Sequence, residues 1–115
     1  MWKTDGPEGE KMIEPIVTAL QPLVTAELRR AQAEHGAEFC SLHEGYGVIC
    51  EEVQEAQEDL NNIRIMMDVM LNLIRYGADV QQIADKIERS ALEGAAECIQ
   101  VAAMCRKMIG DCEAR

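Results

Sequence analysis

The fold is decided by residues 49–74, which read ICEEVQEAQEDLNNIRIMMDVMLNLI. Apolar residues recur there in unbroken steps of four and three, at Ile49, Val53, Ala56, Leu60, Ile63, Met67, Met70 and Ile74. This spacing puts them on one stripe of an α-helix and is typical of a helix–helix packing seam. Beyond Ile63, further apolar residues lie off the stripe. Three helices of one chain would leave that surface uncovered, so we expect an oligomer.

Signals of helix ends lie on both sides of this stretch. Ser41 followed by Glu44 has the pattern of a capping box, which predicts that a helix begins there. Gly77 suits the left-handed residue that ends a helix, and Asp79 suits the N-cap of the next one. Because the turn near Gly77 is short, the two helices should form a long antiparallel hairpin within an all-α helical bundle.

The outer helices are predicted from weaker signals. The first should run from about Lys11 or Pro15 to Glu34, since Gly36 follows it, and residues 1–9 should form a flexible tail. The last should run from Asp79 to about Ile109 or Cys112. A chain of 115 residues fits a single domain, so we assign residues 1–115 to one domain.

Composition excludes several classes of function. A formal net charge of −10 argues against a nucleic-acid partner, because a phosphate backbone attracts basic surfaces. The most apolar run, residues 63–74, is too short to span a bilayer, and no signal peptide is evident, so we expect a cytoplasmic protein. Five cysteines without a CxxC pair indicate small core residues in a reducing compartment rather than a zinc site.

Carboxylates are crowded at the start of the central helix, at Glu51, Glu52, Glu55, Glu58 and Asp59. No Lys or Arg lies three or four residues from Glu52 or Glu55. Like charges at that spacing destabilise a helix by a few tenths of a kcal/mol per pair. A hard divalent cation such as Mg²⁺, which prefers oxygen ligands, would compensate for this repulsion.

Counting from the turn identifies a second group of polar residues at the same level. Glu52 and Glu55 lie 25 and 22 residues before Gly77, and Glu97 and Gln100 lie 20 and 23 residues after it. In an antiparallel hairpin the two pairs would therefore lie side by side, and each pair shares one helix face. We predict that Glu52, Glu55, Glu97 and Gln100 hold Mg²⁺, or Mn²⁺. The alternative is a solvated acidic face near a helix N-terminus.

Two blocks of sequence, HEGYGVICEEVQEA (43–56) and AAECIQVAAMCRK (95–107), carry a resemblance to a known family. They resemble the MazG-like all-α nucleoside triphosphate pyrophosphohydrolases, especially the small members carried by phages and prophages. The resemblance covers roughly residues 27–107. The family motif is EExxE followed by ExxD, and residues 51–55 match its first half fully. It implies catalytic roles for Glu51, Glu52 and Glu55, with Glu51 as an accessory acid or base.

The resemblance also implies a function and an assembly. Relatives of this kind hydrolyse a nucleoside triphosphate to a monophosphate and pyrophosphate with Mg²⁺, and in many of them the pocket lies between subunits. We expect a homodimer or homotetramer. Two features depart from the family: a longer spacer, and Gln100 in place of the final Asp. An amide adds no negative charge, so metal affinity should fall. A non-catalytic helical oligomer that binds nucleotide or a protein partner therefore stays open.

Basic side chains and histidines elsewhere in the chain could contribute to such a site. Lys107, Arg106 and Arg30 are candidates to neutralise phosphate oxygens, although surface placement is the simpler expectation for each. His35 and His43 lie near helix ends, where structural roles are common. A di-iron carboxylate bundle is less favoured, because it needs Glu-x-x-His pairs and neither histidine follows a Glu by three residues.

Overall fold

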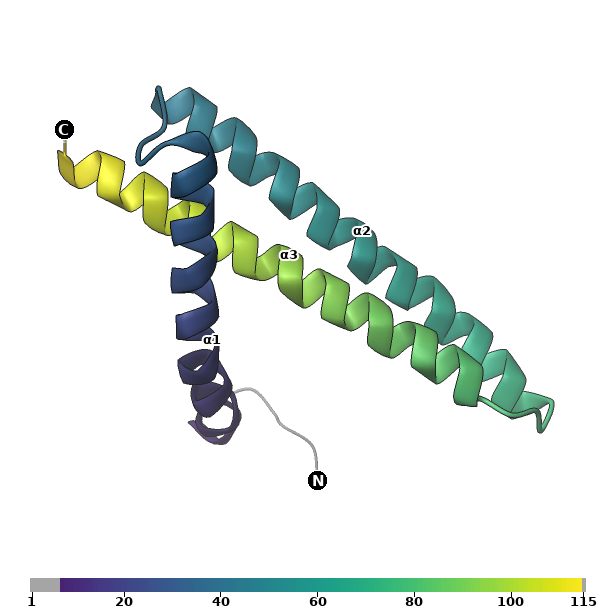
Figure 1. Cartoon of the computed structure of the whole chain (residues 1–115). Coiled ribbons are helices and arrows are strands. Elements are labelled where there is room, and N and C mark those ends of the chain that lie inside the picture. Colours follow the sequence, from purple (N-terminus) through teal and green to yellow (C-terminus); the bar gives the residue numbers. More distant parts are fainter. Residues whose placement is uncertain (1–6, 115) are drawn as a thin grey trace.

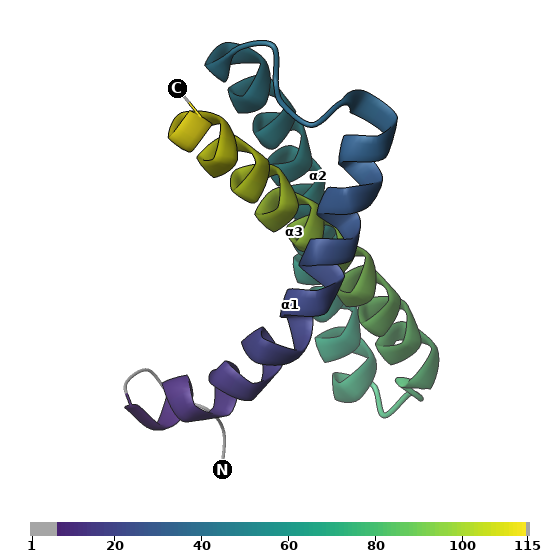
Figure 2. The same ribbon diagram turned by 60° about the vertical axis from the view of Figure 1, so that its left-hand side comes forward.

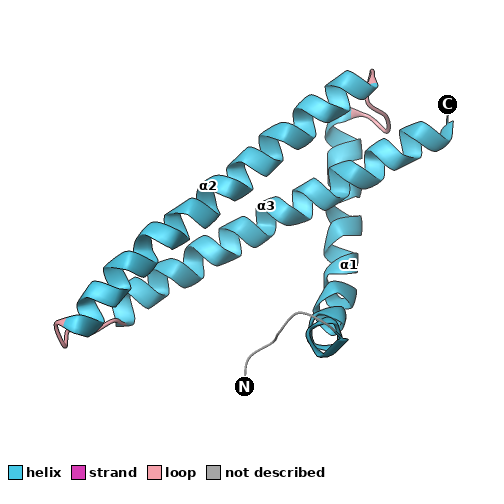
Figure 3. Cartoon of the chain, turned by 180° about the vertical axis from the view of Figure 1, so that it is seen from behind, coloured by secondary structure: helices cyan, strands magenta, loops and turns pink. Residues whose placement is uncertain are grey.

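Three long helices form the protein, seen in a computed structural model that describes residues 7–114. Helix α1 spans Pro7–His35, α2 spans Leu42–Arg75 and α3 spans Gln81–Ala114, with no strand in this range. Helices α2 and α3 lie side by side and run in opposite directions, whereas α1 crosses α3 (Figures 1 and 3). The prediction of an all-α fold is confirmed.

The caps of α2 agree with the sequence signals. Ser41 Oγ accepts a hydrogen bond from the backbone N–H of Glu44 at 3.1 Å. The Glu44 carboxylate accepts in return from the N–H of Cys40 at 3.3 Å, one residue earlier than a standard capping box. At the other end Gly77 has φ +68°, a left-handed conformation that a residue with a side chain rarely adopts.

The outer helices differ from their predicted bounds: α1 begins earlier, and α3 begins two residues later, at Gln81, and ends later. Helix α1 begins at Pro7, so residues 7–9 of the expected tail are helical, and residues 1–6 lie outside the described part. Both Pro15 and Pro22 lie within α1. Helix α3 runs on to Ala114, and Asp79 Oδ1 accepts from the N–H of Gln81 at 3.1 Å, as a capping residue does.

The core lies where α1 crosses α3, a crossing that Figure 2 shows from a second direction. Its buried members come from α1, from the loop before α2, and from α3, and they are Val24, Ala31, Phe39, Ala103 and Met104. A Cβ added at Gly45 of α2 would lie 2.9 Å from the Phe39 ring, so only glycine lets α2 approach this ring.

The predicted seam of α2 is only half covered. Its alternate members, Ile49, Ala56, Ile63 and Met70, are buried or half-buried. The other members, together with Tyr46 one heptad earlier, are exposed, and we call them the outer stripe: Tyr46, Val53, Leu60, Met67 and Ile74. Of the other described helices only α3 packs along α2, and the outer stripe is left without a partner in the described residues.

Two further sequence expectations can be compared with the structure. Cys40, Cys50, Cys98 and Cys112 are exposed and only Cys105 is half-buried, so the prediction of core cysteines is wrong for this chain alone. Their small side chains lie on faces that no described helix covers. In the described part of the chain, no helix combines the length and the apolar content that crossing a bilayer requires.

Candidate metal centre

Glu52 and Glu55 of α2 and Glu97 of α3 meet on the facing sides of the helix pair. One carboxylate oxygen from each lies within 4.8 Å of the other two. Because α2 and α3 run in opposite directions from the turn near Gly77, positions almost equally distant from it come level. Glu52 and Glu97 are half-buried and Glu55 is exposed, so the cluster is open on one side.

The Gln100 amide lies within hydrogen-bonding distance of this cluster. With its nitrogen turned toward the carboxylates, Gln100 donates to Glu52 at 2.6 Å and to Glu97 at 2.9 Å. Rotation of the amide by a half-turn would present its oxygen instead, which is an acceptor and a ligand for hard cations. Gln100 is thus able to bridge the carboxylates in one orientation and to complete an oxygen shell in the other.

The pKa of two of the carboxyl groups is raised, by hydrogen bonding, burial and neighbouring negative charge. A hydrogen bond with Glu97, followed by the negative charges of Glu97, Glu51 and Asp59, raises the pKa of Glu55 above its ordinary 4.5. Burial is the largest cause that raises the pKa of Glu97, and the charges of Glu52 and Asp59 add to it. The cluster therefore resists full ionisation unless a cation balances its charge.

A close approach of the helix backbones supports this geometry. Gly94 of α3 is buried, and a Cβ added there would lie 3.3 Å from Asp59 Cβ of α2. The small side chain lets the two helices come near one turn away from the cluster.

Glu51 does not join the three converging carboxylates. Its side chain is exposed, and its residue lies about 100° around α2 from Glu52. The charge of Glu51 nevertheless contributes to the raised pKa of Glu55. Of the residues predicted for the site, the structure brings together Glu52, Glu55, Glu97 and Gln100, and it leaves Glu51 at their margin.

A cavity of about 270 Å³ adjoins the cluster, and we call it the Lys107 cavity. All three helices and the loop before α2 contribute to its walls, with Glu27, Arg30, Ala31, His35, Phe39, Glu44, Val48, Glu52, Gln100, Met104 and Lys107. Since Glu52 and Gln100 line it as well, the cavity reaches the carboxylate cluster. In this cavity, α1 side chains and two of the predicted ligands, Glu52 and Gln100, face a common space.

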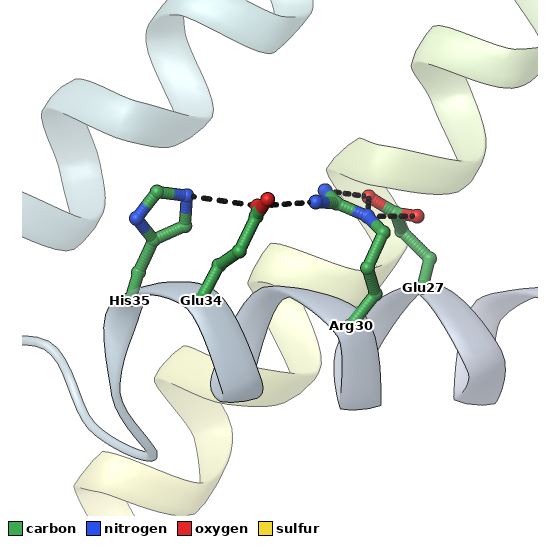
Figure 4. A network of polar contacts seen from close by, with 4 residues as sticks. All are labelled: Glu27, Arg30, Glu34 and His35. Atoms are coloured by element: carbon green, nitrogen blue, oxygen red, sulfur yellow. Dashed lines mark hydrogen bonds and ion pairs between the residues drawn. The ribbon is translucent and has the colours of Figure 1, made fainter.

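One wall of the Lys107 cavity carries a chain of polar contacts along α1 (Figure 4). Arg30 donates to the Glu27 carboxylate at 2.6 and 3.0 Å and to Glu34 at 2.5 Å. His35 Nε2 lies 3.4 Å from the same Glu34 carboxylate. The hydrogen bond from Arg30 is the largest cause that lowers the pKa of Glu27, and a hydrogen bond from Gln100 adds to it.

Glu27 is a site residue that the sequence did not reveal. Its i, i+3 spacing from Arg30 is visible in the sequence, but that spacing is equally typical of a surface ion pair. Only the crossing of α1 over α3 brings Glu27 to Gln100, and no periodicity in the sequence specifies that crossing.

The donor set of the cluster, three carboxylates with an amide oxygen beside them, fits a hard divalent cation. Comparison of the chain with models of protein families, with curated proteins and with solved structures gave no match. The MazG-like resemblance therefore depends on the residues quoted above.

Proposed function

We propose that the protein is a Mg²⁺-dependent nucleoside triphosphate pyrophosphohydrolase of the small MazG-like type. It would convert a (deoxy)nucleoside triphosphate to its monophosphate and pyrophosphate, as part of cytoplasmic nucleotide-pool maintenance, in the manner of phage and prophage members. One observation carries the proposal: carboxylate oxygens of Glu52, Glu55 and Glu97, from two helices, converge within 4.8 Å. The match of residues 51–55 to the EExxE motif adds the reaction class.

Four residues would hold the cation and a fifth would accept a proton. Glu52, Glu55 and Glu97 would hold Mg²⁺, or Mn²⁺, and the Gln100 oxygen would complete their set. The bound cation would polarise a phosphate and make a water molecule more acidic. Glu51, exposed beside the cluster, would take the proton that this water loses as it attacks phosphorus. The ionised Glu55 and Glu97 would balance the charge of the cation.

Pyrophosphate release from the common nucleoside and deoxynucleoside triphosphates, with Mg²⁺ or Mn²⁺, tests this function. We expect turnover by the wild type, loss of at least about 100-fold in Glu52→Gln, and faster turnover in Gln100→Asp, since an added carboxylate strengthens cation binding. Glu58→Gln is the matched control, because Glu58 is exposed on the same helix outside the cluster. Absence of turnover in the wild type and in Gln100→Asp alike would contradict the proposal.

Gln100 itself favours a second candidate function. Its amide nitrogen can donate to both Glu52 and Glu97, so it holds these carboxylates together in the way a cation would. A non-catalytic MazG-like protein that binds nucleotide, or a protein partner, would have this arrangement. Turnover that appears only in Gln100→Asp would favour this second candidate.

The proposed assembly is a homodimer or homotetramer. The outer stripe repeats every seven residues along α2, and three of its members, Tyr46, Leu60 and Ile74, are 69%, 61% and 57% exposed. A heptad of apolar residues is the pattern by which α-helices pair. A second copy of the chain would cover this stripe, and the first half of α1 exposes further apolar side chains.

A further inference from the structure

Lys107 is a buried cation without an anionic partner. Its residue is only 5% exposed, and it lines the cavity that adjoins the carboxylate cluster. Within the described part of the chain, its ammonium makes no hydrogen bond or ion pair, and its recorded contact is with the face of the Phe39 ring, 4.3 Å from the ring centre. In the described residues no side-chain nitrogen or oxygen is both fully buried and without a partner, so the ammonium stays accessible from the cavity, where an anion can pair with it.

The other cations near the site are already engaged. Arg30 is bound by Glu27 and Glu34. Arg106 donates to Thr25 at 2.9 Å and to Gln21, on the side of α3 that contacts α1. Lys107 is therefore the basic side chain of this cavity that is free to bind a ligand.

The acidic side chains of the cavity are occupied in other ways. Glu27 is paired with Arg30, and Glu44 accepts from the N–H of Cys40. Asp111, one turn after Lys107 on α3, is buried and accepts from the N–H of Phe39 at 3.0 Å. None of these carboxylates lies within 4 Å of the Lys107 nitrogen. Lys107 thus keeps its positive charge unpaired, whereas the charge of Glu52, which also lines the cavity, would be offset by a cation at the cluster.

The distance along α3 suits a ligand that extends across the cavity. Lys107 lies seven residues after Gln100, which is two turns or about 10 Å along the helix. Lys107, Gln100 and Glu52 all line the same space. A ligand with several anionic groups can therefore reach Lys107 at one end and the carboxylate cluster, through a bound cation, at the other.

We propose that the Lys107 cavity is a phosphate-binding site, in which the Lys107 ammonium binds phosphate oxygens of a di- or triphosphate chain. That the other end of the phosphate chain contacts a cation on Glu52, Glu55 and Glu97 rests on the proposed function. The role of Lys107 does not require hydrolysis. Phosphate is the class that fits, since a lysine ammonium is a point charge that binds it well and a cation at the cluster would hold its remaining oxygens.

Calorimetric titration of the full chain with inorganic pyrophosphate tests this site, in one arm with Mg²⁺ and in another with a chelator. The variants are Lys107→Met and the control Lys86→Met, which removes an exposed lysine from the same helix. In the Mg²⁺ arm we expect Lys107→Met to bind about 10- to 100-fold more weakly, the range for loss of a charged hydrogen bond, and Lys86→Met to bind as the wild type does. The melting temperature of Lys107→Met should stay close to that of the wild type, because the substitution removes no ion pair or hydrogen bond within the described residues.

A second measurement uses the wild type alone and does not depend on folding of the variant. Pyrophosphate should protect Lys107, and not Lys86, from an amine-acylating reagent, as read by mass spectrometry. Equal binding by Lys107→Met and wild type, no binding by the wild type in either arm, or no protection of Lys107 would overturn the proposal. Protection of Lys107 without any triphosphate turnover would uphold this site and contradict the hydrolase. Triphosphate turnover that Lys107→Met leaves unaffected would uphold the hydrolase and contradict this site.

Discussion

The two ends of the α2–α3 pair differ in how much apolar surface they bury. At the end crossed by α1, Phe39, Ala103 and Met104 are buried. Toward the turn at Gly77, Ile83 is the one buried apolar side chain in residues 60–92, whereas Leu60, Ile65 and Ile74 are more than half exposed. The difference shows that α1 supplies the cover at one end and that nothing in the described chain supplies it at the other.

The candidate metal centre lies at the boundary between these two ends. Gln100 and Glu97 come just before the buried residues Ala103 and Met104 on α3. The crossing therefore fixes one side of the site, and the helix pair that continues toward the turn fixes the other. We expect stability to concentrate at the crossing and association to depend on the turn end.

Truncation of Phe39 should have the largest effect on the free energy of unfolding. Phe39→Ala opens the core at the crossing and should lower the free energy of unfolding by about 3–5 kcal/mol. Leu92→Ala, at the turn end, removes a side chain that is 59% exposed and should change it by less than about 0.5 kcal/mol. Urea unfolding at one protein concentration measures both. Equal losses in the two variants would remove the distinction between the ends.

Gly45 and Gly47 lie within one turn of α2 but differ in how closely their surroundings are packed. An added Cβ at Gly45 would meet the Phe39 ring and Met108, whereas at Gly47 it would meet nothing within 4 Å. Overpacking should make Gly45→Ala less stable by about 1–3 kcal/mol, offset in part by the helix preference of Ala. Gly47→Ala should gain up to about 1 kcal/mol from that preference. Thermal unfolding of both variants checks this, and stabilisation in both would mean that the crossing is loosely packed.

A charge on the outer stripe should break association at the turn end. Leu60→Glu places a carboxylate in the surface that we propose a second copy covers, so self-association should weaken at least about tenfold, or about 1.4 kcal/mol. The neighbouring exposed Asn61→Glu adds the same charge beside the stripe and should associate as the wild type does. Sedimentation equilibrium distinguishes them. A wild type that stays monomeric at every concentration would contradict the proposed assembly.

The smallest expected effect is a pH dependence confined to the metal centre. Glu55 has its pKa raised above 4.5 in the fold, so the folded state holds its proton more tightly than the unfolded state does. Without a cation, the contribution of Glu55 to stability should therefore be full below pH 4.5 and fall as pH rises through the raised pKa. Glu55→Gln should flatten this part of the profile. The raised pKa of Glu55 would be contradicted if the wild type and Glu55→Gln gained the same stability as the pH rises above 4.5.

Much of the antiparallel arrangement of α2 and α3 was predictable, because the signals are local. Ser41 and Gly77 mark the ends of α2, and the count of residues from Gly77 indicates which carboxylates come level. The crossing of α1 was not predictable, because its apolar positions specify a buried face and no partner. Glu27 and the Lys107 cavity follow from that crossing.

The seam of α2 was predicted only in part for a related reason. The spacing of Ile49, Val53 and their successors specifies a stripe, and α3 covers the half that includes Ala56. Whether a second chain covers the half that includes Leu60 does not follow from the spacing. The prediction of core cysteines was wrong for the same reason, since it assumed that a core covers every apolar side chain.

The central claim is that Glu52, Glu55 and Glu97 converge to hold a divalent cation. Anomalous diffraction from crystals grown with Mn²⁺ tests it most directly. We predict a single strong peak between carboxylate oxygens of these three residues, with the Gln100 amide oxygen turned toward it. A map without a peak there, in which the Gln100 amide nitrogen still bridges Glu52 and Glu97, would contradict the claim.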